Sequence, residues 1–267
     1  MRSPIRWFGG KSLLARKIIS LFPTHHTYVE AFGGGASVLF AKIPSPVEIY
    51  NDLDSGLVNF FRVLRDRERF AEFQRLVTLT PYSREEFGFC RQHWEESDDP
   101  IERAYRWYVV VRQSFSGDFK GGWSHGKHRS SRNMGACVSK WLSTVDRLPE
   151  IAERLLRVQI ENRDWRLILK TYDSPNTLFY LDPPYVPETR RAGKYAHELS
   201  LADHSEFVER MLALQGKVVL SGYAHPIYEP LEVAGWQCYN IKTVCYATKV
   251  SISKRRLPRI ETIWVKP

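Results

Sequence analysis

Seven short apolar runs, each bounded by turn residues, constrain how this chain can fold more than any other feature. Runs of this length and composition predict buried strands. Apolar residues at helical spacing over 10–22 and 201–214 place helices between some of them. Strands that alternate with helices favour a mostly parallel sheet with right-handed crossovers, so we expect an α/β fold. The predicted strands span 27–32, 47–50, 157–161, 177–181, 217–221, 236–244 and 260–265.

The alternation of strands and helices stops between residues 55 and 145. Three segments with helical spacing follow one another in this stretch, and none of it has the pattern of a convincing strand. Ser83 and Glu86 fit the capping box of the second helical segment. We therefore expect a helical insertion within a larger α/β domain. The predicted boundaries are 1–54 with 146–267 for that domain, and 55–145 for the insertion.

Positive charge gathers in the last part of the predicted insertion. Residues 119–145 contain no Asp or Glu and are rich in glycine and serine, so we expect a flexible basic loop there. The whole chain of 267 residues has 39 Lys and Arg against 30 Asp and Glu, a formal net charge of +9. A balance this basic indicates an anionic partner, and favours nucleic acid over a membrane surface.

Several classes of protein and site are disfavoured by composition. No apolar run reaches the roughly 18 residues that a membrane span needs, and the N-terminal segment lacks the apolar core of a signal peptide. The four cysteines form no CxxC pair, which predicts reduced thiols in a cytosolic protein. The eight histidines form no ligand cluster, so we expect no metal.

The segment "VEAFGGGASVLF", residues 29–40, predicts a ligand-binding turn. Its glycines let the backbone approach a ligand closely, and a helix N-terminus follows them. Asp52 ends the next strand 19 residues after Gly33, where an acid can bind ribose hydroxyls. The alternative is that Asn51, Asp52 or Asp54 caps the following helix. "GGKS" at 9–12 lacks the first P-loop glycine, so a nucleoside without phosphates, S-adenosylmethionine, fits better.

A second unusual segment is "FYLDPPYVPETRR", residues 179–191. A buried strand ends at an acid, Asp182, and the two prolines that follow prevent it from continuing. Tyr185 comes next, and Arg190 and Arg191 lie just beyond it. The segment is either a functional site or, more simply, a capped turn with a packed tyrosine. The rest of the chain has to decide between these two interpretations.

Five motifs in order, "IRWFGGK", "VEAFGGG", "YNDLD", "ENRDW" and "LDPPY", resemble those of the Dam-like family of DNA adenine methyltransferases. These enzymes transfer a methyl group from S-adenosylmethionine to the exocyclic N6 amine of adenine. The resemblance covers nearly the whole chain and is weak within 55–145. It implies a Rossmann-like methyltransferase sheet with helices on both faces and an inserted helical DNA-recognition domain. It also implies a double-stranded DNA substrate, no metal, a monomer or weak dimer, and the cytoplasm of a bacterial or phage-infected cell.

The resemblance assigns roles residue by residue. The motif Asp182, Pro183, Pro184 and Tyr185 matches the catalytic tetrad. Ala31 is a small departure, since many members have proline there. The cofactor-binding residues implied are Trp7, Lys11, Glu30, Phe32, Gly33, Gly35, Asp52, Asp164, Trp165 and Asp182.

The segment "RQSFSG", residues 112–117, resembles one that enters DNA beside the target base. Phe115 stands at an aromatic wedge position, and the competing interpretation is a core residue of the helix 101–116. Ser116 stands where some members carry a base-reading amide, which leaves the target sequence open. Basic side chains complete the predicted DNA contacts. The predicted DNA-binding residues are Arg112, Phe115, Ser116, Lys120, Lys127, Arg129, Arg132, Arg190 and Arg191.

The tetrad suits amine methylation on chemical grounds. An aromatic amine is a poor nucleophile because its lone pair is delocalised into the ring. The Asp182 carboxylate and the Pro183 carbonyl would accept its two hydrogens, and prolines hold such acceptors fixed. The Tyr185 ring offers a stacking face for a flipped base.

Three other functions remain open from the residues. The first is a cytosine exocyclic-amine methyltransferase, which Asp182 disfavours because such enzymes commonly have Ser at that position. The second is an inactive DNA-binding relative, which the intact motif disfavours, and the third is methylation of RNA. The sequence does not reveal the recognition site or whether a restriction partner exists.

Overall fold

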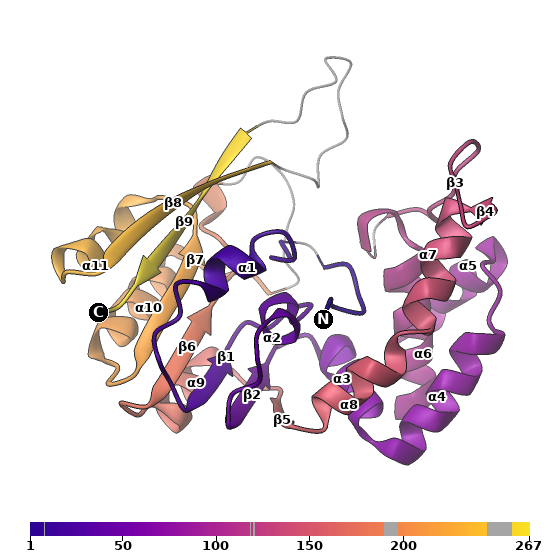
Figure 1. Cartoon of the computed structure of the whole chain (residues 1–267), viewed down its shortest axis with the longest axis horizontal. Helices are drawn as coiled ribbons and strands as arrows, with labels where there is room; N and C mark the ends of the chain where they lie inside the picture. Colours follow the sequence, from indigo (N-terminus) through magenta and orange to yellow (C-terminus); the bar gives the residue numbers. More distant parts are fainter. Residues whose placement is uncertain (8, 118, 120, 190–196, 245–257) are drawn as a thin grey trace. The chain divides into compact units, whose positions relative to one another are not determined.

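The computed structural model describes residues 1–7, 9–117, 119, 121–189, 197–244 and 258–267 (Figure 1). The chain divides into two compact units, and each is described by itself. Unit 1 comprises Met1–Ser12, Gly34–Ala41 and Asp54–Asn162, and unit 2 comprises Leu13–Gly33, Lys42–Leu53 and Arg163–Pro267.

Seven strands form one mixed sheet in the order β5-β2-β1-β6-β7-β9-β8, which confirms the seven predicted strands and the α/β fold. β1 pairs in parallel with both β2 and β6, and β6 pairs in parallel with β7. β9 is antiparallel to both β7 and β8, so this end of the sheet is a hairpin. The strands are β1 Thr27–Glu30, β2 Val47–Asn51, β5 Val158–Glu161, β6 Thr177–Leu181, β7 Lys217–Gly222, β8 Gln237–Val244 and β9 Pro258–Val265.

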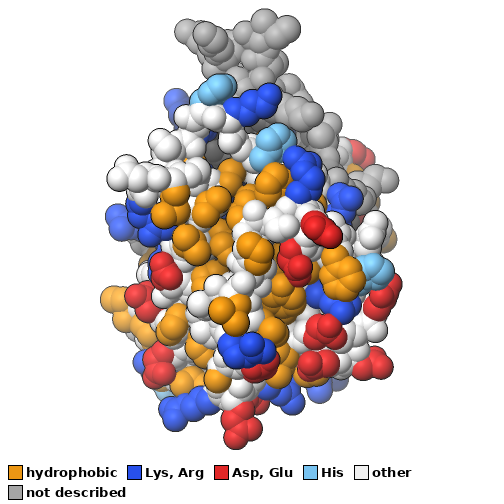
Figure 2. All heavy atoms as spheres, turned by 90° about the vertical axis from the view of Figure 1, so that its right-hand side faces the viewer, with side chains coloured by type: hydrophobic (Ala, Val, Ile, Leu, Met, Phe, Trp, Pro, Cys, Tyr) orange, Lys and Arg blue, Asp and Glu red, His pale blue; other side chains and the backbone are white. Residues whose placement is uncertain are grey.

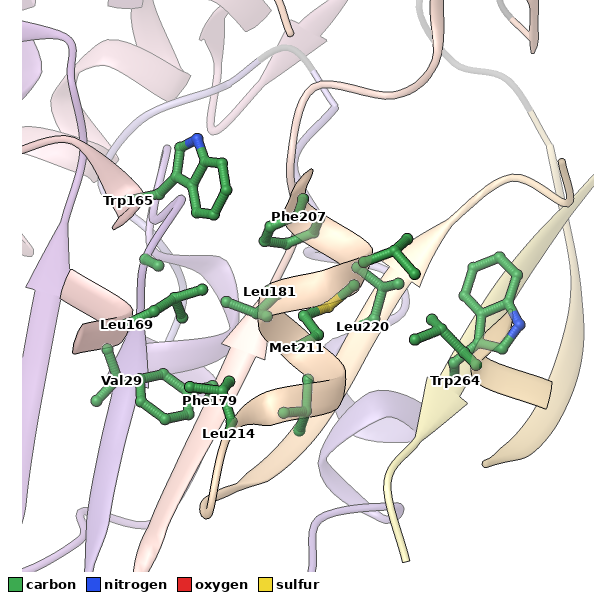
Figure 3. Packing of buried hydrophobic residues seen from close by; sticks show 14 of the residues in the cluster. Val29, Trp165, Leu169, Phe179, Leu181, Phe207, Met211, Leu214, Leu220 and Trp264 are labelled. Carbon is green, nitrogen blue, oxygen red and sulfur yellow. The ribbon is translucent and has the colours of Figure 1, made fainter. Parts of the chain in front are cut away.

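One face of the sheet in unit 2 is covered by helices α9, α10 and α11. Strand residues such as Val29, Phe179 and Leu220 pack there against Leu169 and Met211 of the helices (Figure 3). Because side chains alternate along a strand, the neighbouring residues face the other way. The helices of unit 2 are α1 Ala15–Ile19, α9 Trp165–Tyr172, α10 Leu201–Ala213 and α11 Glu229–Val233, with the short 3-10 turns η2 Pro187–Thr189 and η3 Pro226–Tyr228.

The opposite face of the sheet carries aromatic residues. Phe22, which follows α1, lies with its ring 5.6 Å from Tyr28 of β1 and 5.9 Å from Tyr180 of β6.

The helix predicted over 10–22 is shorter than expected, since only Ala15–Ile19 is α-helical. Gly9 takes φ of 75° in the turn that precedes this segment.

Unit 1 is mostly helical, as the patterns over 55–145 predicted. Helix α6 lies at its centre, where Trp107 and Tyr108 stack on Phe60 of α3 with ring centroids 5.4 and 5.2 Å apart. Its helices are α2 Ser37–Ala41, α3 Ser55–Arg65, α4 Arg67–Leu79, α5 Arg84–His93, α6 Pro100–Gln113, α7 Ala136–Val145 and α8 Leu148–Leu155, with the 3-10 turn η1 Phe115–Gly117.

The predicted capping box of α5 forms by half. The Ser83 side chain accepts from the Glu86 backbone N–H, as an N-cap should. The Glu86 carboxylate instead accepts from the Tyr105 hydroxyl at 2.7 Å and from the Cys90 thiol. A half-buried hydroxyl on the neighbouring helix α6 thus uses the acceptor that the box would need.

The expectation of a strandless loop over 119–145 is wrong in part. Strands β3 Ser130–Ser131 and β4 Met134–Gly135 form a two-residue hairpin, and α7 begins directly after it at Ala136. The turn residues Arg132 and Asn133 have φ of 53° and 56°, as a type I′ hairpin requires. The guanidinium of Arg132 donates to Ser139 of α7, which holds the turn. An Arg-Asn turn lacks the glycine that usually marks such a hairpin.

The compact units follow lines different from the predicted domain boundaries, since unit 1 also takes in residues 1–12 and 34–41 and continues to residue 162. A separate recognition domain over 55–145 stays a prediction. Of the helices that the described residues form, none has the length and apolar character needed to cross a membrane.

Candidate active site

Two acids stand where neighbouring parallel strands of unit 2 end. Glu30 is the last residue of β1, and Asp182 comes directly after β6. Since Glu30 is in register with Tyr180, the two carboxylates belong to the same carboxyl edge of the sheet. Glu30 is buried and accepts a hydrogen bond of 2.6 Å from the Tyr28 hydroxyl. In open α/β sheets, ligands bind at this edge.

Tyr185 lies close to two carboxylates. Its hydroxyl is 3.1 Å from Oδ1 of Asp182, and it is also hydrogen-bonded to Oε1 of Glu261 on β9. The ring is only 5% exposed and packs edge-on against Tyr223, with centroids 4.7 Å apart at 72°. The tyrosine of the predicted tetrad is therefore held by both its hydroxyl and its ring.

Sequence reasoning missed Glu261. It lies within "IETIWV", where an acid interrupts an apolar strand. The signal that could have flagged it is this single carboxylate, because charged groups are rarely buried without a partner. The partner itself could not be read from the sequence, since Tyr185 is 76 residues away.

The carboxylates at this edge act on a buried neighbour. Burial and then the charge of Asp182 raise the pKa of the Tyr180 hydroxyl well above its usual value, and Glu30 and Glu261 add to the rise. Tyr180 therefore stays neutral and shares a 3.0 Å hydrogen bond with Ser221. The edge concentrates negative charge, which suits a positively charged or hydrogen-donating ligand.

The glycines after β1 are required by close packing. A Cβ on Gly33 would lie 2.2 Å from the Tyr50 ring, and the Gly33 N–H donates to the Asn51 carbonyl at 2.8 Å. Within unit 1, a Cβ on Gly34 or Gly35 would lie 2.6 or 2.9 Å from Trp7. Gly34 also has φ of 46°. Any side chain at these three positions would displace a ring.

Trp7 and Lys11 are fixed within unit 1. The Trp7 ring lies 6.1 Å from Trp107 of α6, and its carbonyl accepts from the Gly10 N–H. Lys11 is buried, and its ammonium donates to the Gly9 carbonyl at 3.0 Å. Both predicted cofactor residues are thus ordered by the Gly-Gly-Lys turn itself.

Asn51 is a second residue whose part was missed. Its amide nitrogen donates to the carbonyls of Ala31 and Arg163 at 2.8 and 2.9 Å, and its oxygen accepts from the Arg163 N–H at 2.8 Å. One buried side chain therefore joins the segment after β1 to the turn before α9. The sequence marked Asn51 only as a possible helix cap.

The cap of α3 is Asp54, whose carboxylate accepts from the Leu57 N–H at 2.9 Å. The interpretation of Asp52 as the cap of this helix is therefore wrong. Asp52 follows β2 at the carboxyl edge and is half-buried. This position fits a carboxylate that binds hydroxyls.

Asp164 and Trp165 begin α9. Asp164 caps the helix by accepting from the Arg166 N–H at 2.8 Å, and its other oxygen pairs with the Arg166 guanidinium. Trp165 is 1% exposed and packs edge-on against Phe207, 5.0 Å away. Figure 3 shows both rings at the end of the core towards which β6 points. Phe32 is the half-buried ring of this cluster, 5.6 Å from Phe207.

Residues 7–225 match the family model of the D12 class N6 adenine-specific DNA methyltransferases. The chain belongs to this family. It methylates the N6 amine of adenine in DNA, and the resemblance drawn from the five motifs is confirmed.

Curated relatives agree. The chain is 27% identical to the type II methyltransferase M1.LlaDCHI of Lactococcus lactis subsp. cremoris, over 86% of this chain and 84% of that protein. It is 23% identical to the modification methylase StsI of Streptococcus sanguinis and to the type II methyltransferase M.FokI of Planomicrobium okeanokoites, over 71% of this chain. It spans only 29% and 30% of those two proteins.

A solved rRNA methylase from Streptococcus thermophilus aligns over 94% of both chains, with 9% identity and a TM-score of 0.33. A likeness of this size is too small to support an argument.

Phe115 of the methyltransferase lies beyond the end of helix α6 at Gln113 and is 56% exposed. Its backbone N–H donates to the Gly122 carbonyl at 2.9 Å, which fixes the chain around an exposed ring. Ser116 follows it in η1. The interpretation of Phe115 as a core residue of a helix is thus wrong, while its contact with DNA stays a prediction.

Arg112 is turned inward instead of outward. Its guanidinium donates to Thr144 and to the Lys140 carbonyl of α7, and its buried Nε has no partner among the described residues. Burial lowers the pKa of this guanidinium. The geometry favours a structural part for Arg112, and its predicted DNA contact stays untested.

The acid-free segment places several cations at the surface of unit 1. Lys127 and Arg129 are exposed, as are His125 and His128 beside them. On the face shown in Figure 2, Lys, Arg and His side chains predominate in the upper part, and Asp and Glu side chains gather lower down. Arg132 is exposed but is bonded to Ser139. The predicted DNA-binding residues Lys120, Arg190 and Arg191 lie outside the described residues.

In the part of the chain that the structure describes, no three His, Cys, Asp or Glu side chains are grouped as metal ligands would be.

Replacing Asn51 with Ala should destabilise unit 2, because it removes three hydrogen bonds, one of them to the carbonyl of the buried residue Ala31. We expect a loss of about 2–4 kcal/mol in the free energy of unfolding, measured in urea. Asn51→Asp is the matched control: it keeps the acceptor for Arg163 and loses both donors, so its loss should be of similar size. An alanine variant as stable as the parent would show that the three bonds do not hold this edge together.

Proposed function

We propose that the chain transfers the methyl group of S-adenosylmethionine to the N6 amine of an adenine rotated out of double-stranded DNA. The observation that supports this best is the placement of Asp182 and Tyr185. They follow β6 at the carboxyl edge, with 3.1 Å between the hydroxyl and the carboxylate. A carboxylate acceptor and a fixed aromatic ring on one short segment are what a flipped base with an amine requires.

In this proposal the acceptors act on the amine before the reaction. The Asp182 carboxylate accepts one amine hydrogen, and the Pro183 carbonyl accepts the other. This draws the nitrogen lone pair out of conjugation with the ring. The lone pair then forms the new N–C bond, the departing sulfur keeps the electrons of the broken C–S bond, and the nitrogen loses one proton through Asp182 to water. Two prolines hold both acceptors in place, so little reorganisation is needed.

When bound, S-adenosylmethionine supplies a methyl group on a positively charged sulfur. Two observations support the residues that we propose to bind it. The glycines after β1 leave no room for side chains at the turn, and Asp52 at the carboxyl edge is not the cap of α3. Asp52 would bind the ribose hydroxyls, and Asp164 and Trp165 would receive the adenine. The remaining proposed cofactor residues are Trp7, Lys11, Glu30, Phe32, Gly33, Gly35 and Asp182.

DNA would be bound by exposed cations of the acid-free segment 119–145 and by Phe115. Lys127 and Arg129 contact phosphates, and Phe115 enters the space beside the flipped adenine. An exposed ring supported by a fixed backbone suits that part, because unstacking a base costs a few kcal/mol that the ring can partly recover.

The named relatives suggest a biological setting. Modification methylases and type II methyltransferases protect DNA at defined sites, so we propose that this chain modifies DNA alongside a restriction enzyme. It would act as a monomer or weak dimer in the cytoplasm of a bacterial or phage-infected cell.

Asp182→Ala should abolish methyl transfer while cofactor affinity stays within about tenfold, or about 1.4 kcal/mol. The reason is that Asp182 is assigned mainly to the target amine. Turnover is measured on DNA with tritiated methyl donor, and affinity by calorimetry. Asp182→Asn, which keeps the shape and one acceptor oxygen, separates charge from hydrogen bonding. Turnover within a few-fold of the parent in the alanine variant would disprove the assignment.

Asp52→Ala should weaken binding of S-adenosylmethionine by about 1–3 kcal/mol, the range for leaving hydroxyl partners unmatched. DNA affinity should hardly change. Asp54→Ala is the control, because it removes the cap of α3 at a cost of about 1 kcal/mol in stability and should leave cofactor affinity alone. Equal cofactor affinity in both variants would refute the ribose role.

Replacing both Lys127 and Arg129 with Ala should weaken binding to all DNA sequences alike. Each phosphate contact adds about 0.9 to the slope of log affinity against log salt, so the slope should fall by about 1–2. Affinity is measured by fluorescence anisotropy at several salt concentrations. The pair Arg62→Ala and Arg67→Ala, exposed elsewhere in unit 1, removes the same charge. An equal effect of both pairs would mean that only net charge matters.

A further inference from the structure

Glu261 lies in an unusual position for a carboxylate. The residue is 4% exposed. It lies on β9 between Ile260 and Thr262, in register with Ile241 of β8. A buried carboxylate is costly unless it is paired or hydrogen-bonded. One of its hydrogen-bond partners is the hydroxyl of Tyr185, on the segment that follows β6.

The Tyr185 hydroxyl has two carboxylates within reach and one hydrogen to donate. Oδ1 of Asp182 is 3.1 Å away, and Oε1 of Glu261 is the other acceptor. A phenol carries a single O–H donor, so it can serve only one of them at a time. If the hydrogen pointed to Asp182, the target amine would have to compete with it for that oxygen.

Both carboxylates act on the same buried residue. The charges of Asp182 and Glu261 each act on the Tyr180 hydroxyl, and Tyr185 packs against Tyr223 on its ring side. The guanidinium of Arg259, two residues before Glu261 on β9, lies 5.2 Å over the Tyr223 ring. β9 therefore supports the Tyr185 ring indirectly as well as its hydroxyl.

We propose that Glu261 is a positioning residue for amine methylation. It accepts the single hydrogen of Tyr185, and so turns this hydrogen away from Asp182 and fixes the ring on which the base stacks. Asp182 then accepts its hydrogen from the adenine amine. This inference rests on the proposed roles of Asp182 and Tyr185, and it adds a residue from the C-terminal hairpin to the site.

The first test compares two substitutions of Glu261. Glu261→Leu removes the acceptor, so kcat should fall by about tenfold or more, the change expected for one hydrogen bond to a charged group. Affinity for S-adenosylmethionine and KM for DNA should stay within about threefold, because neither ligand is assigned to Glu261. Glu261→Gln keeps an acceptor oxygen at the same place and should recover kcat to within about threefold of the parent.

Stability controls accompany these variants. Thr262→Val changes the next residue of β9, whose hydroxyl donates to Asn240 at 3.0 Å, and should lower the melting temperature with kcat unchanged. If the leucine variant does not fold, Glu261→Thr replaces it. The threonine side chain is too short for its hydroxyl to reach Tyr185. A leucine or threonine variant that folds and turns over at the parent rate overturns the proposal. A glutamine variant as slow as the leucine variant also overturns it, because charge alone would then matter.

The second test uses Tyr185→Phe as a background. Without the hydroxyl there is no hydrogen to direct, so adding Glu261→Leu should change kcat by less than about twofold, whatever the rate of the single variant. A further loss of about tenfold in this background would show that Glu261 acts by another route. If the parent chain itself left adenine unmethylated, or Asp182→Ala stayed active, the proposed function would fail, which is a different result from any of these.

Discussion

Parallel pairing of β1 with both β2 and β6 is the constraint on which the rest of the site depends. It brings the carboxyl ends of three strands to one edge, although they are separated by long stretches of chain. Glu30 and Asp182 both belong to this edge, because each lies at the end of its strand. A shift of one residue in register would turn these side chains to the opposite face. The buried packing of Val29, Phe179 and Leu220 against α9 and α10 makes such a shift costly.

Polar groups at this edge hold its loops in place through hydrogen bonds. Three hydrogen bonds of the Asn51 side chain join the segment after β1 to the turn before α9. The hydroxyl of Tyr28 donates to Glu30, and that of Tyr185 lies within hydrogen-bond distance of both Asp182 and Glu261. Such bonds contribute little net stability each, but leaving one partner unsatisfied costs more. The consequence is an edge in which each polar side chain has a defined orientation, as catalysis by fixed acceptors requires.

The hairpin of β8 and β9 extends the sheet and also reaches the site. Because β9 is antiparallel to β7, the first half of β9 lies beside the carboxyl end of the parallel strands. That is where Glu261 stands. A strand added in the parallel sense would present its last residues there, so the antiparallel pairing is what gives this segment a place in the chemistry.

Much of this molecule could be predicted from the sequence. All seven strands of the sheet, the helical character of 55–145 and the five ordered motifs depend on local periodicity and on residue types at short spacing. The α/β fold and the family follow from them. Local signals were less reliable where the turn chemistry was unusual, as in the Arg132–Asn133 hairpin, whose positive φ angles are stabilised by bonds to α7. Tertiary structure alone decided which polar residues meet. Asn51 with Arg163, Arg112 with α7, and Tyr185 with Glu261 are joined across 28 to 112 residues of chain. No pattern within a short window can specify such contacts, because they are set by how the strands and helices pack.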